Sequence, residues 1–184
     1  MIMKKTGLFR RSVLFLVLTT LFAASVVHAQ DPKLQRLIDD SEKAKTSFIE
    51  SDKFMQHMFT NAYGYAILPN VGKGAAGIGG AAGSGIVYEQ GKMIGSVKMK
   101  QLTVGLQVGG QAFREVIFFE DKETLDRFKT NEFEFSAQTS AAAIKAENYA
   151  NAEYTDGVLV FTQKKTGLMY DASIGGQKFN YDAF

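Results

Sequence analysis

Glycine recurs throughout residues 63–88, and this density constrains the fold more than any other feature of the sequence. Glycine costs backbone entropy in regular structure and adds no packing area, so its repeated use needs a physical reason. Small apolar residues fill the positions between the glycines, which argues against a polar, flexible linker. A phosphate-binding loop is disfavoured too, because no helix pattern follows the loose GxGxxA match at 77–82. The stretch therefore predicts a strongly bent, closely packed strand that another part of the backbone approaches.

Residues 1–29 have the three parts of a cleavable signal peptide. Basic residues come first, an apolar stretch follows at 13–22, and Val27-His28-Ala29 forms the small-residue end that favours cleavage before Gln30. The apolar stretch is too short to span a bilayer. No cysteine follows it, which excludes the lipid anchor of a lipoprotein. We expect an exported protein that is periplasmic or secreted and not lipid-anchored.

Removal of this segment changes the sign of the net charge. The whole chain has 21 basic and 19 acidic residues, and all charged residues within 1–29 are basic. The mature chain keeps 17 basic residues against 19 acidic ones, a formal charge of about −2. A nucleic-acid partner is therefore not expected. Because the chain has no cysteine, no disulfides are expected. Residues 30–184 are numerous enough to bury a core without them, and we expect these residues to form a single domain.

Three helices are predicted. Apolar residues recur near the 3.6-residue period over 31–49, where Asp31 and Pro32 are typical of a helix start. The apolar side of this helix either packs on the domain or docks on a membrane, and the balance between its acids and lysines favours packing. A second, short helix at 52–59 completes a helical N-terminal part at 31–60. The third is expected at 121–129, with Asp121 as the capping residue.

From residue 62 onward the pattern favours strands. Turn sequences at 89–92, 156–157, 164–167 and 175–176 separate them, whereas residues 132–154 are ambiguous and favour a strand up to about 145. The expected fold class is α+β. About seven or eight short, mainly antiparallel strands form a strongly curved sheet or barrel-like body at 62–184, with N-terminal helices and one inserted helix. The glycines expected to have structural roles are Gly72, Gly74, Gly79, Gly80, Gly83, Gly85, Gly105 and Gly109.

A catalytic site has little support in the sequence. His57 is the single histidine after residue 29, and no nucleophile motif accompanies it. The acidic group at 120–126 is explained by a helix start, because it lacks the spacing of a calcium-binding loop. We therefore expect no enzyme activity, no cofactor and no metal.

Five blocks of sequence together resemble the SYLF domain family. They are AILPNVGKG at 66–74, the glycines at 79–85, GLQVGGQ at 105–111, FF at 118–119 with the helix that ends at 128, and GLM at 167–169. The likeness covers residues 62–178 and is to a bacterial, exported member. It implies a lipid-binding module, since eukaryotic relatives bind phosphoinositide membranes and some bind actin. It also implies no enzymatic activity.

The resemblance leads us to expect association with a membrane surface through anionic or phosphate-bearing lipids. The basic residues expected near the headgroups are Lys33, Arg36, Lys43, Lys45 and Lys73. Lys73 lies between two glycines whose backbone N–H groups could help to hold a phosphate, although an exposed turn lysine is an equal alternative. The competing function is a structural or interaction role with proteins of the cell envelope. Actin is not an expected partner, because an exported protein does not meet the eukaryotic filament.

Overall fold

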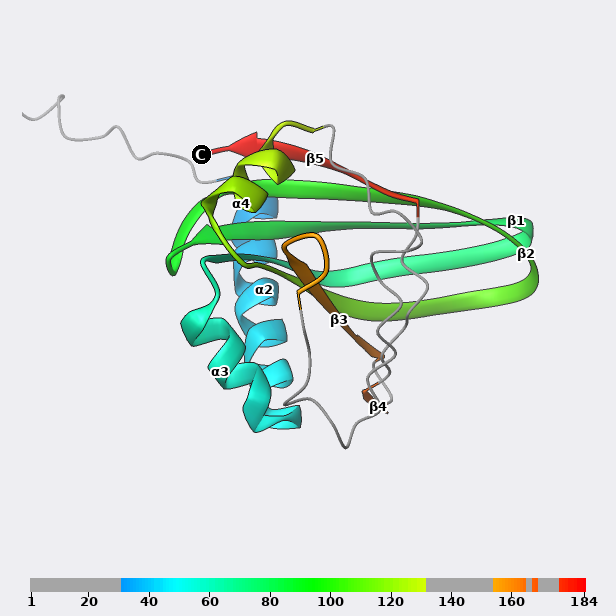
Figure 1. Ribbon diagram of the computed structural model, residues 1–184. Coiled ribbons are helices and arrows are strands. Elements are labelled where there is room, and N and C mark those ends of the chain that lie inside the picture. Colours follow the sequence, from blue (N-terminus) through cyan, green and yellow to red (C-terminus); the bar gives the residue numbers. More distant parts are fainter. Residues whose placement is uncertain (1–30, 132–153, 165–166, 169–175) are drawn as a thin grey trace, which may run out of the picture. The chain divides into compact units, whose positions relative to one another are not determined.

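The computed structural model describes residues 31–131, 154–164, 167–168 and 176–184. Lys33–Phe184 form one compact unit. Two helices come first in the described ranges, two long strands follow, and a helix and three shorter strands complete them (Figure 1). The strand expected at 132–145 lies outside the described residues, so it stays a prediction.

The centre of the fold is one hairpin of two antiparallel strands, β1 (Gly64–Glu89) and β2 (Lys92–Phe119). Gln90 and Gly91 form its turn, with positive φ angles of 49° and 78°. Positive φ at both central residues is what a two-residue type I′ hairpin turn requires. The turn predicted at 89–92 is therefore confirmed.

The prediction that the strands before the inserted helix are short is wrong. β1 and β2 contain 26 and 28 residues, and they replace the several short strands expected before the inserted helix. The glycines that suggested breaks lie inside the strands, where shifts in register occur between Leu68 and Val71, between Ala76 and Ile78, and between Val87 and Tyr88. Such irregularities bend a strand without ending it.

The hairpin folds back so that the two ends of β1 meet. A Cβ atom on Gly85 would lie 2.2 Å from the carbonyl oxygen of Ile67, and one on Gly83 would lie 2.9 Å from Cγ2 of Val71. Both distances are shorter than real side chains tolerate, so only glycine permits this approach of the backbone. The sharp bend of β1 is thus a steric consequence of the glycine-rich sequence.

Hydrogen bonds and ring stacking hold the two ends of β1 next to each other. The backbone N–H of Gln90 donates to the carbonyl of Tyr63 at 2.9 Å, and the Tyr63 hydroxyl donates to the Glu89 carboxylate at 2.7 Å. The rings of Tyr65 and Tyr88 stack with their centroids 4.8 Å apart. Residues more than twenty positions apart in one strand therefore become neighbours.

Helices α2 (Pro32–Ser51) and α3 (Lys53–Asn61) confirm the two helices predicted at the N-terminal part. The side chain of Asp52 separates them and caps α3, because it accepts a hydrogen bond from the backbone N–H of Phe54 at 2.8 Å. Polar contacts fasten the end of α2 to the sheet. Arg114 donates to Ser47 at 3.2 Å and to Gln163 at 3.1 Å, and Gln163 donates to the hydroxyl of Ser51 at 2.6 Å.

Two of the remaining strands, β3 and β5, pair with the two halves of β2. Helix α4 (Lys122–Lys129) is capped by Asp121, as predicted, and the turn at 156–157 leads to β3 (Val158–Lys164). β3 pairs with residues 113–119 of β2 and with β4 (Gly167–Leu168), whereas β5 (Gln177–Ala183) pairs with residues 95–101. Each half of β2 therefore lies between β1 and a second strand.

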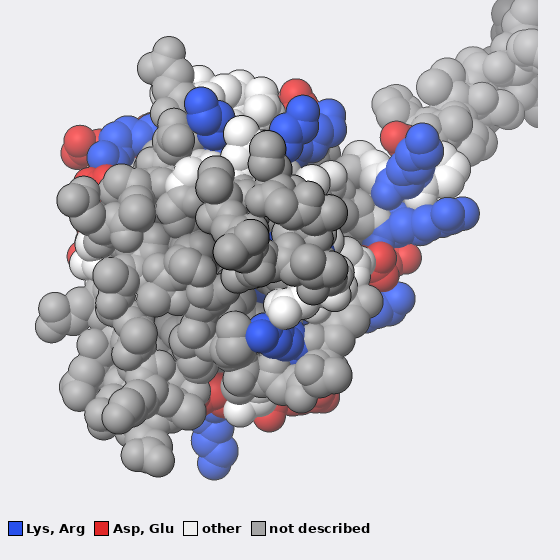
Figure 2. Space-filling view, turned by 90° about the vertical axis from the view of Figure 1, so that its right-hand side faces the viewer, with Lys and Arg blue, Asp and Glu red and all other residues white. Residues whose placement is uncertain are grey.

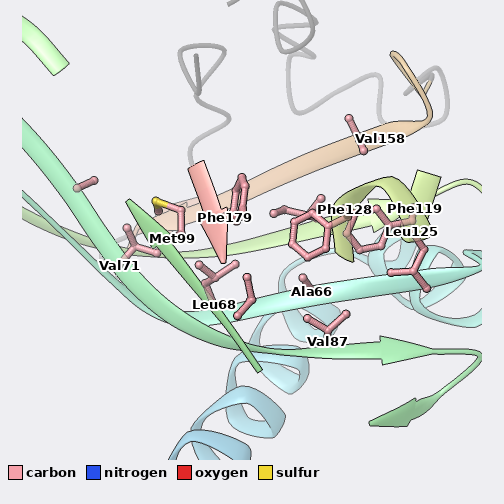
Figure 3. Packing of buried hydrophobic residues seen from close by; sticks show 13 residues of the cluster. Ala66, Leu68, Val71, Val87, Met99, Phe119, Leu125, Phe128, Val158 and Phe179 are labelled. Atoms are coloured by element: carbon pink, nitrogen blue, oxygen red, sulfur yellow. The ribbon is translucent and has the colours of Figure 1, made fainter. Parts of the chain in front are cut away.

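Two hydrophobic cores lie on opposite sides of the strands. One packs α2 and α3 against the sheet around the fully buried rings of Phe48, Phe118 and Phe161. The other gathers residues of β1, β2 and β5 around α4, and Figure 3 shows Phe119, Phe128 and Phe179 pointing into it. The predicted fold class is thus confirmed: an α+β fold with a curved antiparallel sheet, N-terminal helices and one inserted helix.

Candidate functional site

Lys45, one of the basic residues expected at lipid headgroups, is bound within the fold. Its ammonium donates to the hydroxyl of Tyr65 at 2.9 Å. It also lies 5.1 Å from the ring centroid of Phe59 and 5.0 Å from that of Tyr65, in the range of cation–π attraction. Lys45 therefore holds α2 on the sheet, and sequence periodicity alone could not distinguish this role from ligand binding.

The other predicted basic residues of α2 lie on its outer side. Lys33, Arg36 and Lys43 are exposed, and the Lys43 ammonium lies 3.6 Å from the carboxylate of Asp40. Three apolar residues of the N-terminal half of α2, which also contains Lys33 and Arg36, are only partly covered by the body: Leu34, Leu37 and Ile38. This part of α2 thus presents both basic and apolar groups.

Lys73 lies apart from α2. It is half-buried in β1, opposite Gln111, in the part of the strand that leads into the bend. Figure 1 shows this bend at the end of the sheet away from α2. No atom lies within 4 Å of a Cβ placed on Gly72 or Gly74, so the space beside Lys73 is open. The structure does not bring the five predicted basic residues into one site.

The glycines with predicted structural roles differ in their surroundings. A Cβ on Gly80 would lie 3.2 Å from the carbonyl oxygen of Gln101, which is tight but longer than the distances at Gly83 and Gly85. Gly79, Gly105 and Gly109 lie within β1 and β2. Steric exclusion of a side chain is therefore strongest where β1 meets itself.

His57 has no catalytic surroundings in the part of the chain that the structure describes. Its side chain is exposed on α3 and stacks on Phe54, with the ring centroids 6.3 Å apart. Within 31–131, 154–164, 167–168 and 176–184, no three acidic or histidine side chains are grouped to hold a metal ion. The helices of these ranges also include none that is long and apolar enough to cross a membrane.

A group of lysines that the sequence did not single out lies on the open face of β2 and β5. We call it the lysine face, and it consists of Lys98, Lys100 and Lys178 together with Leu102. All four side chains are exposed, and Leu102 is 81% exposed. In Figure 2, lysine and arginine side chains lie along the upper margin of the molecule.

Strand register places two of these lysines directly opposite each other. Lys100 pairs with Lys178, and Lys98 pairs with Asn180. The Lys98 ammonium also lies 3.4 Å from the carboxylate of Asp182. Apolar residues alternate with polar or charged ones at 97–100 and 178–182, and this alternation indicates that the lysines lie on one face of each strand. The pairing of β5 with β2 could not be read from that alternation.

Tyr88 gives the aromatic cluster around Lys45 a dependence on pH. Burial raises the pKa of Tyr88 from 10.0 to about 12. The unfolded chain loses this proton near pH 10, whereas the folded protein keeps it until about pH 12. The neutral hydroxyl therefore contributes fully to stability below pH 10, and this contribution is lost as the pH rises through about 12. We expect the free energy of unfolding to fall there by up to about 1.4 kcal/mol per pH unit for this one group. Thermal unfolding measured between these pH values tests the slope.

The matched control is Tyr88→Phe, which keeps the ring and removes the titrating group. Burial also raises the pKa of Tyr154 to about 12, and this residue contributes to both proteins alike. The variant should therefore lose less stability at alkaline pH than the unmodified protein. Equal losses in the two proteins would contradict the role of Tyr88.

Comparison with known proteins gives two matches. Residues 100–183 match the sequence profile of the Ysc84 family, described as "Las17-binding protein actin regulator". The chain is also similar to a protein of Aeromonas veronii named beta cell expansion factor A, with 29% identity over 154 residues. The match covers 83% of this chain and 54% of that relative, so the chain spans about half the relative's length.

The family match includes Lys100, Leu102 and Lys178 of the lysine face, whereas Lys98 precedes it. It begins at Lys100 of β2 and ends with β5, and it includes α4. The sequence blocks that resemble the SYLF domain begin earlier, in β1, and continue into the same region. These matches confirm the predicted resemblance to the SYLF family, which the Ysc84 profile represents.

Proposed function

We propose that this protein is an exported, non-catalytic module that associates with anionic or phosphate-bearing lipids at the cell envelope. The observation that carries the proposal is the N-terminal half of α2. There, Leu34, Leu37 and Ile38 are only partly covered and lie on the same helix as exposed basic residues. The uncovered parts of these three side chains, next to basic residues, can enter the boundary between headgroups and acyl chains.

The energetics of such an association follow from the groups that α2 presents. Burial of apolar area supplies most of the affinity, and each lysine or arginine near an anionic surface adds about 1 kcal/mol. The acids on α2 limit this electrostatic contribution, so affinity should depend on both the apolar residues and the basic ones. Lys45 is excluded from the contact because it is engaged with Tyr65.

Export and the absence of catalysis belong to the same proposal. Residues 1–29 have the pattern of a signal peptide, and cleavage before Gln30 leaves the mature chain. The name of the Ysc84 family refers to binding of Las17 and to actin regulation. Las17 is not part of the proposal, and the match to this family supports a binding module more than an enzyme.

The experiment that tests the proposal is co-sedimentation of the mature protein, residues 30–184, with vesicles of increasing anionic lipid content at low and moderate salt. We expect binding that grows with anionic lipid and weakens with salt. The double variant Lys33→Glu/Arg36→Glu should weaken it by at least tenfold, since it reverses two charges. Lys73→Glu tests whether the open space beside the bend also contacts headgroups.

Lys53→Glu is the matched control, because Lys53 is an exposed lysine at the start of α3. Its reversal should change vesicle binding less than the double variant does. If the mature protein sediments with no vesicles at any salt, direct lipid binding is wrong. An interaction role with envelope proteins then becomes the better account.

A further inference from the structure

We propose that Arg114 of β2 and Asn70 of β1 form a site that binds a phosphate group, next to the C-terminal end of α2. The inference goes beyond the proposed function, because it names a different surface and does not require a membrane. Arg114 is half-buried, and its Nη1 donates to the hydroxyl of Ser47 at 3.2 Å and to the side-chain oxygen of Gln163 at 3.1 Å. These two contacts fix the orientation of the guanidinium group.

The other edge of the Arg114 guanidinium keeps its donors. The group is planar and its three nitrogens are evenly spaced around the carbon, so the edge formed by Nε and Nη2 faces directly away from Nη1. Among the described residues, only Nη1 has hydrogen-bond acceptors, and none of their ion pairs includes Arg114. The Nε–Nη2 edge can bind two oxygens of one phosphate or carboxylate group at once.

Fastening of α2 to the sheet does not explain this edge. The carbonyl end of a helix carries about half an elementary negative charge, which a nearby cation stabilises. The carbonyl of Ser47, however, already accepts from the hydroxyl of Ser51 at 2.6 Å and from the amide of Gln163 at 3.4 Å. Arg114 contacts α2 through Nη1 and the Ser47 hydroxyl, so its Nε–Nη2 edge has no part in holding the helix.

A β-bulge in β1 lies opposite Arg114. The register of β1 and β2 shifts between Leu68 and Val71, so that Pro69 and Asn70 lie together opposite this one residue. Bulges are common beside functional sites, where they redirect a side chain. Asn70 is exposed, and its amide can donate to a third oxygen. A phosphate group has that third oxygen and a carboxylate does not, so the pair of residues favours phosphate.

The sheet beside Arg114 is open toward the bend. Ala112 is the next residue of β2 on the same face, and it pairs with Gly72 of β1. Both residues are exposed, and no atom of the described residues lies within 4 Å of a Cβ placed on Gly72. These small residues leave room for a molecule that carries the phosphate. A phosphate monoester, either on a lipid headgroup or on a soluble molecule, is therefore the expected ligand.

The test is an NMR titration of the mature protein in which inorganic phosphate replaces chloride at constant ionic strength. The Nε–H resonance of Arg114 should shift until binding saturates. Arg114→Lys keeps the charge but removes the planar edge, so it should weaken binding by at least tenfold. Asn70→Ala should weaken binding by about fivefold. The matched control is Gln111→Ala, which removes an exposed amide on the opposite face of β2 and should bind phosphate normally.

Stability measurements separate binding from a structural role. Asn70 is exposed, so Asn70→Ala should change the midpoint of thermal unfolding by no more than about 1 °C while it weakens phosphate binding. Phosphate should raise the midpoint of the unmodified protein, because the ligand binds the folded state, and should not raise that of Arg114→Lys. The inference is wrong if the Nε–H resonance of Arg114 does not respond to phosphate. It is also wrong if Asn70→Ala and Arg114→Lys bind phosphate as the unmodified protein does.

Two further probes identify the source of the phosphate and separate this inference from the proposed function. They are glycerol phosphate and phosphatidylcholine vesicles that contain phosphatidic acid, whose phosphate is also a monoester. Loss of vesicle binding in both variants would support a lipid headgroup, whereas loss of glycerol phosphate binding alone would support a soluble ester. Vesicle binding without a response to either soluble phosphate overturns the phosphate site alone. Phosphate binding without vesicle binding overturns the proposed function alone.

Discussion

Gly85→Ala should destabilise the protein by at least about 3 kcal/mol, because the new Cβ has no room. It would lie 2.2 Å from the carbonyl oxygen of Ile67 and 2.8 Å from its carbonyl carbon. These are backbone atoms of the opposite end of β1, so a change of rotamer cannot relieve the clash. The midpoint of thermal unfolding, followed by circular dichroism, should fall by roughly 10 °C.

Gly72→Ala is the matched control for this substitution. It adds the same methyl group to the same strand, but no atom lies within 4 Å of the new position. Alanine also restricts the unfolded chain more than glycine does, so stability should stay equal or rise by a few tenths of a kcal/mol. Similar losses in the two variants would show that glycine acts through strand propensity and not through the contact between the ends of β1.

Phe118→Ala should cost about 3–5 kcal/mol, the range for removing a buried phenylalanine ring. Phe118 is fully buried in the middle of the sheet. Its ring centroid lies 5.0 Å from that of Phe59 on α3 and 5.9 Å from that of Phe161 on β3. The cavity would therefore loosen helix and sheet together, which denaturant unfolding would measure as a lower midpoint.

Phe184→Ala is the corresponding control on the surface. This ring is 59% exposed after the end of β5, so its removal should change stability by less than about 0.5 kcal/mol. If Phe118→Ala proved equally mild, the core between α3 and the sheet would be able to collapse around the lost ring. The prediction of a rigid aromatic core would then be wrong.

Local signals were sufficient to predict the helices and turns. Asp121 proved to be the predicted helix cap, and the 89–92 turn has the backbone that its sequence requires. Each of these features depends on interactions between residues within a few positions of one another. Such interactions can be read directly from the order of the residues.

The candidate site depends on long-range pairing, and sequence patterns do not determine it. Lys100 and Lys178 are far apart in the sequence and become neighbours only through the register of β2 and β5. Lys45 has the periodicity of an exposed helix residue, yet the rings of Phe59 and Tyr65 surround its ammonium. Its role depends on the tertiary position of two aromatic residues.

The continuity of β2 has a consequence for how the chain folds. The β1–β2 hairpin can form from its turn outward. Residues 95–101 of β2, however, obtain their second neighbouring strand only when β5 pairs with them, and β5 lies near the end of the described chain. Pairing over such a long stretch of sequence is slow, because loop closure costs entropy before the contacts form. Until β5 pairs with it, this segment of β2 is an open edge that can accept a strand from another chain. We therefore expect that a chain interrupted before β5 is prone to associate with its own copies.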